Sequence, residues 1–169
     1  FQLEDPITAF RTIFYTNNFA SYGHLLKDSP EELTDNTRLC LEQGSQTTGA
    51  EYADALRAVE VLRARVEDLM ESYDLLLSPT MAAPPFPIGQ PPQHIGGKEV
   101  QPSSSYSPLT RPFNLTGHPA ASIPCGFSSE GLPIGLHIIG RLEDEATVLR
   151  ASAAFEQARP WAQHRPAID

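Results

Sequence analysis

Cysteine and lysine are scarce in this sequence. The two cysteines, Cys40 and Cys125, form neither a disulfide framework nor a metal motif, so we expect a reducing, cytoplasmic compartment. Lys27 and Lys98 are the only lysines, and the formal net charge is -9 at pH 7. A chain this acidic repels phosphate backbones and anionic lipid, which argues against nucleic-acid and membrane-surface partners.

Long apolar runs and leader signals are also missing. No stretch approaches the roughly 20 apolar residues that span a bilayer, and no signal peptide opens the sequence. Phe1 stands where an initiator Met would be, so we expect this sequence to belong to a longer chain. Its 169 residues are enough for one domain with a real core, and 40% hydrophobic residues are ordinary for a soluble globular protein.

Residues 6–72 carry helix signals. An Asp-Pro pair predicts a helix over residues 6–20, and a Ser-Pro-Glu-Glu run predicts a second one, capped by Ser29 and ended by Gly44. Residues 50–72 carry apolar side chains every three or four positions, which predicts a long amphipathic helix. The stripe consists of Tyr52, Leu56, Val59, Leu62, Val66, Leu69 and Met70.

Residues 73–118 change character. Leu75, Leu76 and Leu77 form a short apolar run that suits a strand buried on both faces, as in a parallel sheet. Twelve of the sixteen prolines fall between Pro79 and Pro133, so this stretch is not helical. Within it, residues 82–108 are predicted to form a long surface loop, and such loops are usually functional or mobile.

Residues 119–160 are predicted to form a hairpin followed by a closing helix. Apolar residues alternate over 121–127 and again over 134–138, with a turn-like segment between them. Pro124 indicates an unpaired stretch in the first strand. Asp144 is the expected cap of the last helix, which stops before Pro160. Its packing residues would be Val148, Leu149, Ala151, Phe155 and Ala158.

No motif for a metal, a cofactor or a serine nucleophile is present. Ser103–Ser105 lacks the nearby glycine and base that an active serine needs, so a polar loop is the better interpretation. Cys125 sits at an inward strand position and is expected to act as a small hydrophobe. His118 lies in a turn that could line a pocket, whereas His137 is expected to be structural.

Several long blocks nevertheless occur in the order and spacing found in one enzyme family. They are residues 51–56, 73–80, 112–127, 131–141, 144–149 and 154–156. Together they resemble amidase-signature enzymes over nearly the whole chain from about residue 29. The resemblance implies an α/β fold, the C-terminal part of the amidase-signature fold. In that part, a mixed sheet that includes an antiparallel hairpin is covered by helices, and residues 1–169 form a single fragment.

The resemblance also implies amide-bond hydrolysis through a Ser–cis-Ser–Lys triad, in which the lysine acts as base. The family's triad lies upstream of the region that these blocks match. Neither Lys27 nor Lys98 has the matching surroundings, so no catalytic residue is assigned and this chain alone is expected to be inactive. The implied partners are a small amide substrate and the rest of the amidase, and exposed sheet edges favour self-association.

Four residues are expected to contact substrate. Thr80 and Met81 follow the apolar strand, where a ligand crevice is expected at the carboxyl end. Arg111 and Asn114 lie in a matched block, and an arginine there could bind a carboxylate through its fork or be a surface or structural group.

Two alternatives to the hydrolytic amidase remain. The first is one component of a glutamine-dependent tRNA amidotransferase. In those proteins an acidic residue falls about seven positions before the matched Asn, whereas here that position is near Ser107, which favours a stand-alone amidase. The second alternative is a structural or binding fragment with no chemistry.

Overall fold

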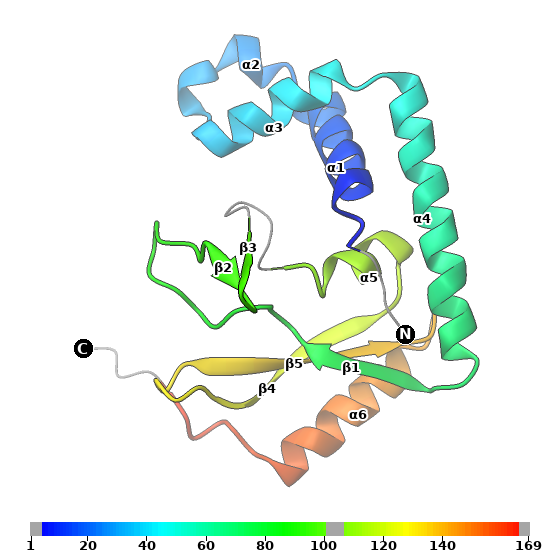
Figure 1. Ribbon diagram of the computed structural model, residues 1–169, viewed down its shortest axis with the longest axis vertical. Helices are drawn as coiled ribbons and strands as arrows, with labels where there is room; N and C mark the ends of the chain where they lie inside the picture. The colour runs from blue at the N-terminus through cyan, green and yellow to red at the C-terminus, as the bar shows by residue number, and fades with distance from the viewer. Residues whose placement is uncertain (1–4, 101–106, 166–169) are drawn as a thin grey trace. The chain divides into compact units, whose positions relative to one another are not determined.

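The long helix α4 (Gly49–Met70), labelled in Figure 1, contains the boundary between two parts of the chain. A computed structural model describes residues 5–100 and 107–165. The chain divides after Ala64 into two compact units, which we call the helical unit (up to Ala64) and the sheet unit (from Arg65). In the part of the chain that the structure describes, no helix is both long and apolar enough to cross a membrane.

The helical unit contains α1 (Ile7–Tyr22), α2 (Leu25–Asp28), the 3-10 turn η1 (Pro30–Glu32) and α3 (Asp35–Gln46) before α4 begins. Helix α1 agrees with the predicted helix over residues 6–20. Figure 1 shows α1 and α3 side by side.

The predicted start and end of α3 were wrong. Ser29 makes no capping hydrogen bond, and Leu33 is extended, so the Ser-Pro-Glu-Glu run forms only η1. Thr34 is the actual cap, and its Oγ1 accepts a hydrogen bond from the N–H of Thr37 at 3.3 Å. Gly44 lies inside α3, where a Cβ would collide with the carbonyl of Tyr15 in α1. Its missing side chain therefore permits close helix packing rather than ending the helix.

A reciprocal cap fixes the start of α4. The N–H and hydroxyl of Thr48 each donate to Glu51 Oε2 at 2.8 Å, and the N–H of Glu51 donates to Thr48 Oγ1 at 3.2 Å. The buried positions then recur every three or four residues, as predicted. They are Ala55, Val59, Leu62, Val66 and Met70. Leu56 was expected in this stripe but is exposed, and the neighbouring Ala55 is buried instead.

The main sheet contains β1 (Leu75–Pro79), β4 (Ala120–Phe127) and β5 (Pro133–Gly140) in the order β1-β5-β4. Both strand pairs are antiparallel, so the expectation of a parallel strand buried on both faces was wrong. In the described part of the chain β1 lies at the sheet edge, and Leu77 is 63% exposed. The run of three leucines therefore marks an edge strand.

The β4–β5 pair confirms the predicted antiparallel hairpin. Its register shifts between Pro124 and Gly126, which agrees with the expectation that proline, having no N–H, interrupts the ladder. The turn closes with a hydrogen bond of 2.8 Å from the N–H of Ser128 to the carbonyl of Leu132. Gly131 adopts a φ of +77° there, a conformation that favours glycine.

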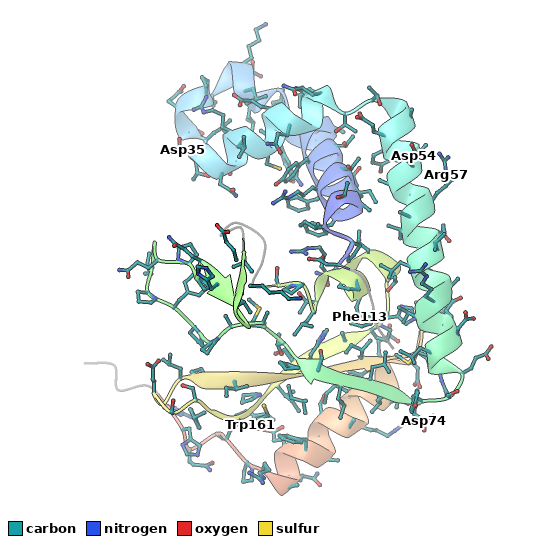
Figure 2. The ribbon with its side chains drawn as sticks, in the orientation of Figure 1. Asp35, Asp54, Arg57, Asp74, Phe113 and Trp161 are labelled. Atoms are coloured by element: carbon teal, nitrogen blue, oxygen red, sulfur yellow. The ribbon has the colours of Figure 1, made fainter. Side chains whose placement is uncertain are left out.

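Helix α6 (Glu145–Ala158) packs on one face of this sheet, and Asp144 caps it as predicted by accepting a hydrogen bond from the N–H of Thr147 at 3.2 Å. Ile123, Ile138 and Val148 form the core between them. Trp161 packs against this core, on the side of the sheet opposite Phe113 (Figure 2). Leu149, expected to pack inward, is 65% exposed.

The remaining elements come between β1 and β4 in the sequence. The strands β2 (His94–Ile95) and β3 (Lys98–Glu99) form a small antiparallel pair inside the predicted loop 82–108. Helix α5 (Arg111–Thr116) follows, and Gly117 ends it with a φ of +78°.

Candidate functional site

A row of small polar side chains lies on the face of the sheet opposite α6. His137 is directly opposite both Ser78 in β1 and Ser122 in β4. Residues paired in this way point to the same face, whereas Ile138, the next residue, points to the core under α6. Strand alternation therefore gathers hydroxyl and imidazole groups on one surface.

Thr80 and Ser122 are joined at the end of this row. Their hydroxyl oxygens lie 2.7 Å apart, and the N–H of Thr80 donates to the carbonyl of Gly135 at 2.9 Å. A Cβ at position 135 would lie 2.6 Å from Thr80 Oγ1 and 2.8 Å from Ser122 Oγ. The absence of a side chain at Gly135 thus makes room for the hydroxyl pair just beyond the carboxyl end of β1.

His137 supports this surface from within the sheet. Its side chain is buried, with 4% exposure, and its Nδ1 lies 3.4 Å from Ser78 Oγ. The ring of Phe113 packs edge-on against it at a centroid distance of 5.6 Å. Burial lowers the pKa of His137, because removal from water disfavours the charged imidazolium. The imidazole is therefore neutral near pH 7, which suits a packing role.

Met81 lines a cavity of about 420 Å³, which we call the proline-lined cavity. Its walls come from the loop after β1 and from the first residues of β5. They are Met81, Ala82, Ala83, Pro84, Pro85, Phe86, Pro133, Ile134 and Gly135. The hydroxyls of Thr80 and Ser122 lie directly beside Gly135, which lines the cavity. The hydroxyl pair is therefore next to the cavity.

Arg111 and Asn114 lie on α5. Arg111 is 3% exposed at the first helical position, and Asn114 is exposed one turn later. Neither is among the described residues that line the proline-lined cavity. Of the four predicted contacts, only Met81 is a described lining residue of this cavity; Thr80 precedes it in the chain, and Arg111 and Asn114 lie on α5. A substrate role for all four therefore remains a prediction.

His118 lines a different cavity, also of about 420 Å³, with residues from α4 and from the end of β5. Its Nδ1 lies 2.8 Å from the hydroxyl of Thr116. On the same wall, Arg141 donates to the carbonyls of Met70 at 3.1 Å and Tyr73 at 3.3 Å. These contacts tie the exit of β5 to the end of α4, which indicates a structural role for Arg141.

Cys125 is the other nucleophile candidate that lies among the described residues. Cys125 is half-buried, and its Sγ lies 3.4 Å from the carbonyl of Ile134. Ser103–Ser105 lies outside the described residues. Within residues 5–100 and 107–165, no group of three His, Cys, Asp or Glu side chains is placed to hold a metal ion.

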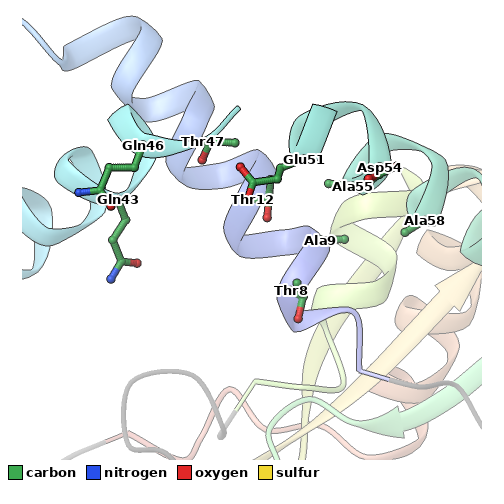
Figure 3. A pocket seen from close by; sticks show the side chains of 10 residues that line it. All are labelled: Thr8, Ala9, Thr12, Gln43, Gln46, Thr47, Glu51, Asp54, Ala55 and Ala58. Atoms are coloured by element: carbon green, nitrogen blue, oxygen red, sulfur yellow. The ribbon is translucent and has the colours of Figure 1, made fainter. Parts of the chain in front are cut away.

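The helical unit has a hollow of about 560 Å³ between α1, α3 and α4 (Figure 3). Its lining mixes polar side chains with alanines, and both carboxylates among the described lining residues are already engaged. Glu51 accepts the capping hydrogen bonds of Thr48, and the backbone bond is the main cause that lowers the pKa of Glu51. Asp54 pairs with Arg57 on the same helix. No evident catalytic group therefore lies among the described lining residues of this hollow.

Sequence reasoning missed Ser122 and Gly135. Both occupy strand positions that alternate with the core residues. On that face the strands carry small or polar residues, such as Ser122 in β4 and Gly135 in β5, next to His137. Reading both faces of each strand, rather than the core face alone, would have found them.

Comparisons with known proteins agree with the fold and the sequence blocks. A family model described as Amidase matches residues 12–149. A glutamyl-tRNA(Gln) amidotransferase subunit of Oceanobacillus iheyensis is 40% identical over 121 residues, covering 70% of this chain and 23% of that protein. The putative amidase AmiB2 of Mycobacterium tuberculosis is 36% identical over 140 residues, covering 82% of this chain and 30% of that protein.

A solved structure gives the same result. The crystal structure of a bacterial aryl acylamidase of the amidase-signature family matches with a TM-score of 0.83 and 26% identity, covering 95% of this chain and 36% of that one. The chain thus spans less than a third of the length of the curated relatives it matches. The family match over most of the sequence, together with the shared fold, shows that this chain belongs to the amidase-signature family.

Proposed function

We propose that this chain is the C-terminal portion of an amidase that hydrolyses carbon–nitrogen bonds of small amides. The Ser–cis-Ser–Lys triad would lie outside these residues. The chain would contribute core and one wall of the substrate pocket, with Thr80 and Met81 at that wall and Arg111 and Asn114 as further contacts.

One observation supports this proposal most directly. In a chain of the amidase-signature family, the hydroxyls of Thr80 and Ser122 meet beside a cavity at the carboxyl end of β1. Small-molecule sites are typically concave and mostly apolar, with a few polar groups that orient the ligand. A wall of this kind can position an amide, but without a nucleophile and base it cannot cleave one.

The proposal is tested with the full-length gene product that contains these residues. We expect it to release ammonia or amine from simple neutral amides, and we expect the 169-residue chain alone to release none. Thr80→Val keeps the shape of the side chain and removes its hydroxyl, so kcat/KM should fall about tenfold, the loss of one buried hydrogen bond to substrate. Thr8→Val, an equivalent change on α1, serves as the control.

Two outcomes would contradict the proposal. Turnover by the 169-residue chain, abolished by mutation of one of its serines, would place the chemistry within it. Activity of the full-length product that required glutamine and a tRNA-bound acceptor would instead support the amidotransferase alternative.

A further inference from the structure

We propose that the proline-lined cavity receives a neutral, apolar group of the amide substrate, as large as an aromatic ring. This inference rests on the proposed function only in taking the ligand to be an amide substrate. The shape and chemistry of the cavity carry the rest.

The first argument is the chemistry of the walls. All nine described lining residues lack an ionisable side chain. Proline rings, alanine methyls and the side chains of Met81, Phe86 and Ile134 form most of the surface. A carboxylate or ammonium placed there would lose part of its hydration, and none of the nine described lining side chains could pair with it, which is costly. The cavity therefore favours uncharged groups.

The second argument is size. The cavity measures about 420 Å³, whereas an engineered apolar cavity of about 150 Å³ is large enough to bind benzene. A phenyl group with a further substituent thus fits, and a single methyl group would leave most of the space unfilled. Apolar contact grows with the surface removed from water, so larger neutral groups should bind more tightly.

The third argument is rigidity. Pro84 and Pro85 fix two consecutive φ angles in the loop, and Pro133 fixes another at the start of β5. Walls held in this way lose little conformational freedom when a ligand binds, which favours affinity.

The fourth argument is the hydroxyl pair next to the cavity: Thr80 and Ser122 are not among its described lining residues, but both hydroxyls lie beside Gly135, which is. Thr80 and Ser122 share one hydrogen bond between their hydroxyls, and each hydroxyl carries one hydrogen. One O–H is used inside the pair, so the other can donate to a ligand acceptor at the Gly135 end of the cavity. A neutral amide carbonyl is such an acceptor. The pair would orient the amide while its apolar group fills the space between the prolines.

Binding tests this inference without requiring turnover. The 169-residue chain, labelled at the methyl groups of Met, Ala and Ile, is titrated with benzamide, benzoate and acetamide and followed by NMR. We expect benzamide to shift the methyl signals of Met81, Ala82, Ala83 and Ile134. Benzoate should bind at least tenfold more weakly, and acetamide should leave these signals unchanged at the same concentration.

Two variants sharpen the test. Ala83→Glu puts a carboxylate in the wall and should weaken benzamide binding at least tenfold, whereas Ala153→Glu makes the same change on the exposed surface of α6 and should leave it unchanged. Phe86→Leu is a milder change that removes aromatic surface, and a loss of about threefold is expected. It keeps the inference testable if Ala83→Glu alters the circular dichroism of the chain.

The possible results separate the two proposals. Equal affinity for benzoate and benzamide, no shift with benzamide in large excess over the protein, or shifts that persist in both cavity variants would overturn this inference. Selective benzamide binding together with a full-length product that hydrolyses no amide would support the cavity assignment and overturn the proposed function.

Discussion

Arg141 Nε donates a hydrogen bond of 3.1 Å to the carbonyl of Met70, the last residue of α4. Its Nη2 reaches the carbonyl of Tyr73 and also lies 3.1 Å from Asp74 Oδ1. One planar group thus satisfies carbonyls at the helix end and just before β1. The fork geometry of arginine suits this arrangement, and the point charge of lysine does not.

We therefore expect Arg141→Ala to lower the free energy of unfolding by about 1–3 kcal/mol, since two carbonyls lose a charged donor. Arg141→Lys should recover less than half of this loss. Asp74→Asn should cost under about 0.5 kcal/mol, because that ion pair is exposed to solvent. Urea denaturation gives the free energy of unfolding of each of these three variants. If Arg141→Ala were as stable as the unmodified chain, the structural role of Arg141 would be contradicted.

Acid should weaken the packing around His137. Burial holds the pKa of His137 below its ordinary value of 6.5. In the unfolded chain the imidazole takes up a proton near that value, while in the folded chain it stays neutral. The contribution of His137 to stability is therefore fully present above the unfolded pKa and is lost as pH falls below it.

The measurement is thermal unfolding between about pH 7.5 and 5. His137→Gln cannot be protonated, so its Tm should fall less over this range than that of the unmodified chain. The other histidines are common to both proteins and cancel in the difference. Parallel pH profiles would refute the assignment.

Asp144 should contribute to stability through its cap on α6. The carboxylate of Asp144 accepts a hydrogen bond from the N–H of Thr147. The pKa of Asp144 is lowered, mainly by a hydrogen bond with the side chain of Thr147. Asp144→Ala removes the acceptor and should lower Tm by about 3 °C, while Asp144→Asn keeps a capping oxygen and should cost less. Differential scanning calorimetry distinguishes them, and an Asn variant as unstable as the Ala variant would show that the cap depends on charge.

Gly135 should not tolerate a side chain. The added methyl of Gly135→Ala would press on the hydroxyls of Thr80 and Ser122, at a cost of about 1–3 kcal/mol. Thr80→Ala removes the nearer hydroxyl, so the double variant should be more stable than the sum of the two single changes predicts. A double-mutant cycle measures this coupling, and strict additivity would mean that the neighbouring groups move aside freely.

The uncovered edge of β1 should promote self-association of the isolated chain. Leu77 is exposed, and β1 lies at the edge of the described sheet. A charged residue on an edge strand discourages pairing with another chain. Leu77→Lys should therefore shift sedimentation profiles toward the monomer, whereas Leu149→Lys on α6 should not. A strictly monomeric unmodified chain would contradict this expectation.

Local chemistry was sufficient to predict several elements from the sequence. Asp144 and the alternating strands 121–127 and 134–138 predicted α6 and the hairpin, because caps and strand periodicity act over a few neighbouring residues. Pro124 indicated the bulge for the same reason. These signals depend little on the rest of the fold.

Other features depend on contacts between distant residues and were not predictable in this way. Gly44 resembles a helix terminator until Tyr15 is placed against it. The run Leu75–Leu77 resembles a strand buried on both faces until the strand order is known. Of the hydroxyl pair, Thr80 was expected from its place after a strand, whereas Ser122 is 42 positions away and meets it only through the sheet register.

The bulge at Pro124 makes the two sides of the described sheet unequal. Along β4, the register shifts between Pro124 and Gly126, whereas the pairing of β1 with β5 runs unbroken from Leu75 to Pro79. Each outer strand contains a proline, but Pro79 is the last residue of β1, whereas Pro124 lies inside β4, where a missing N–H weakens a ladder. Regular pairing with a further strand is therefore expected along β1 and disfavoured along β4.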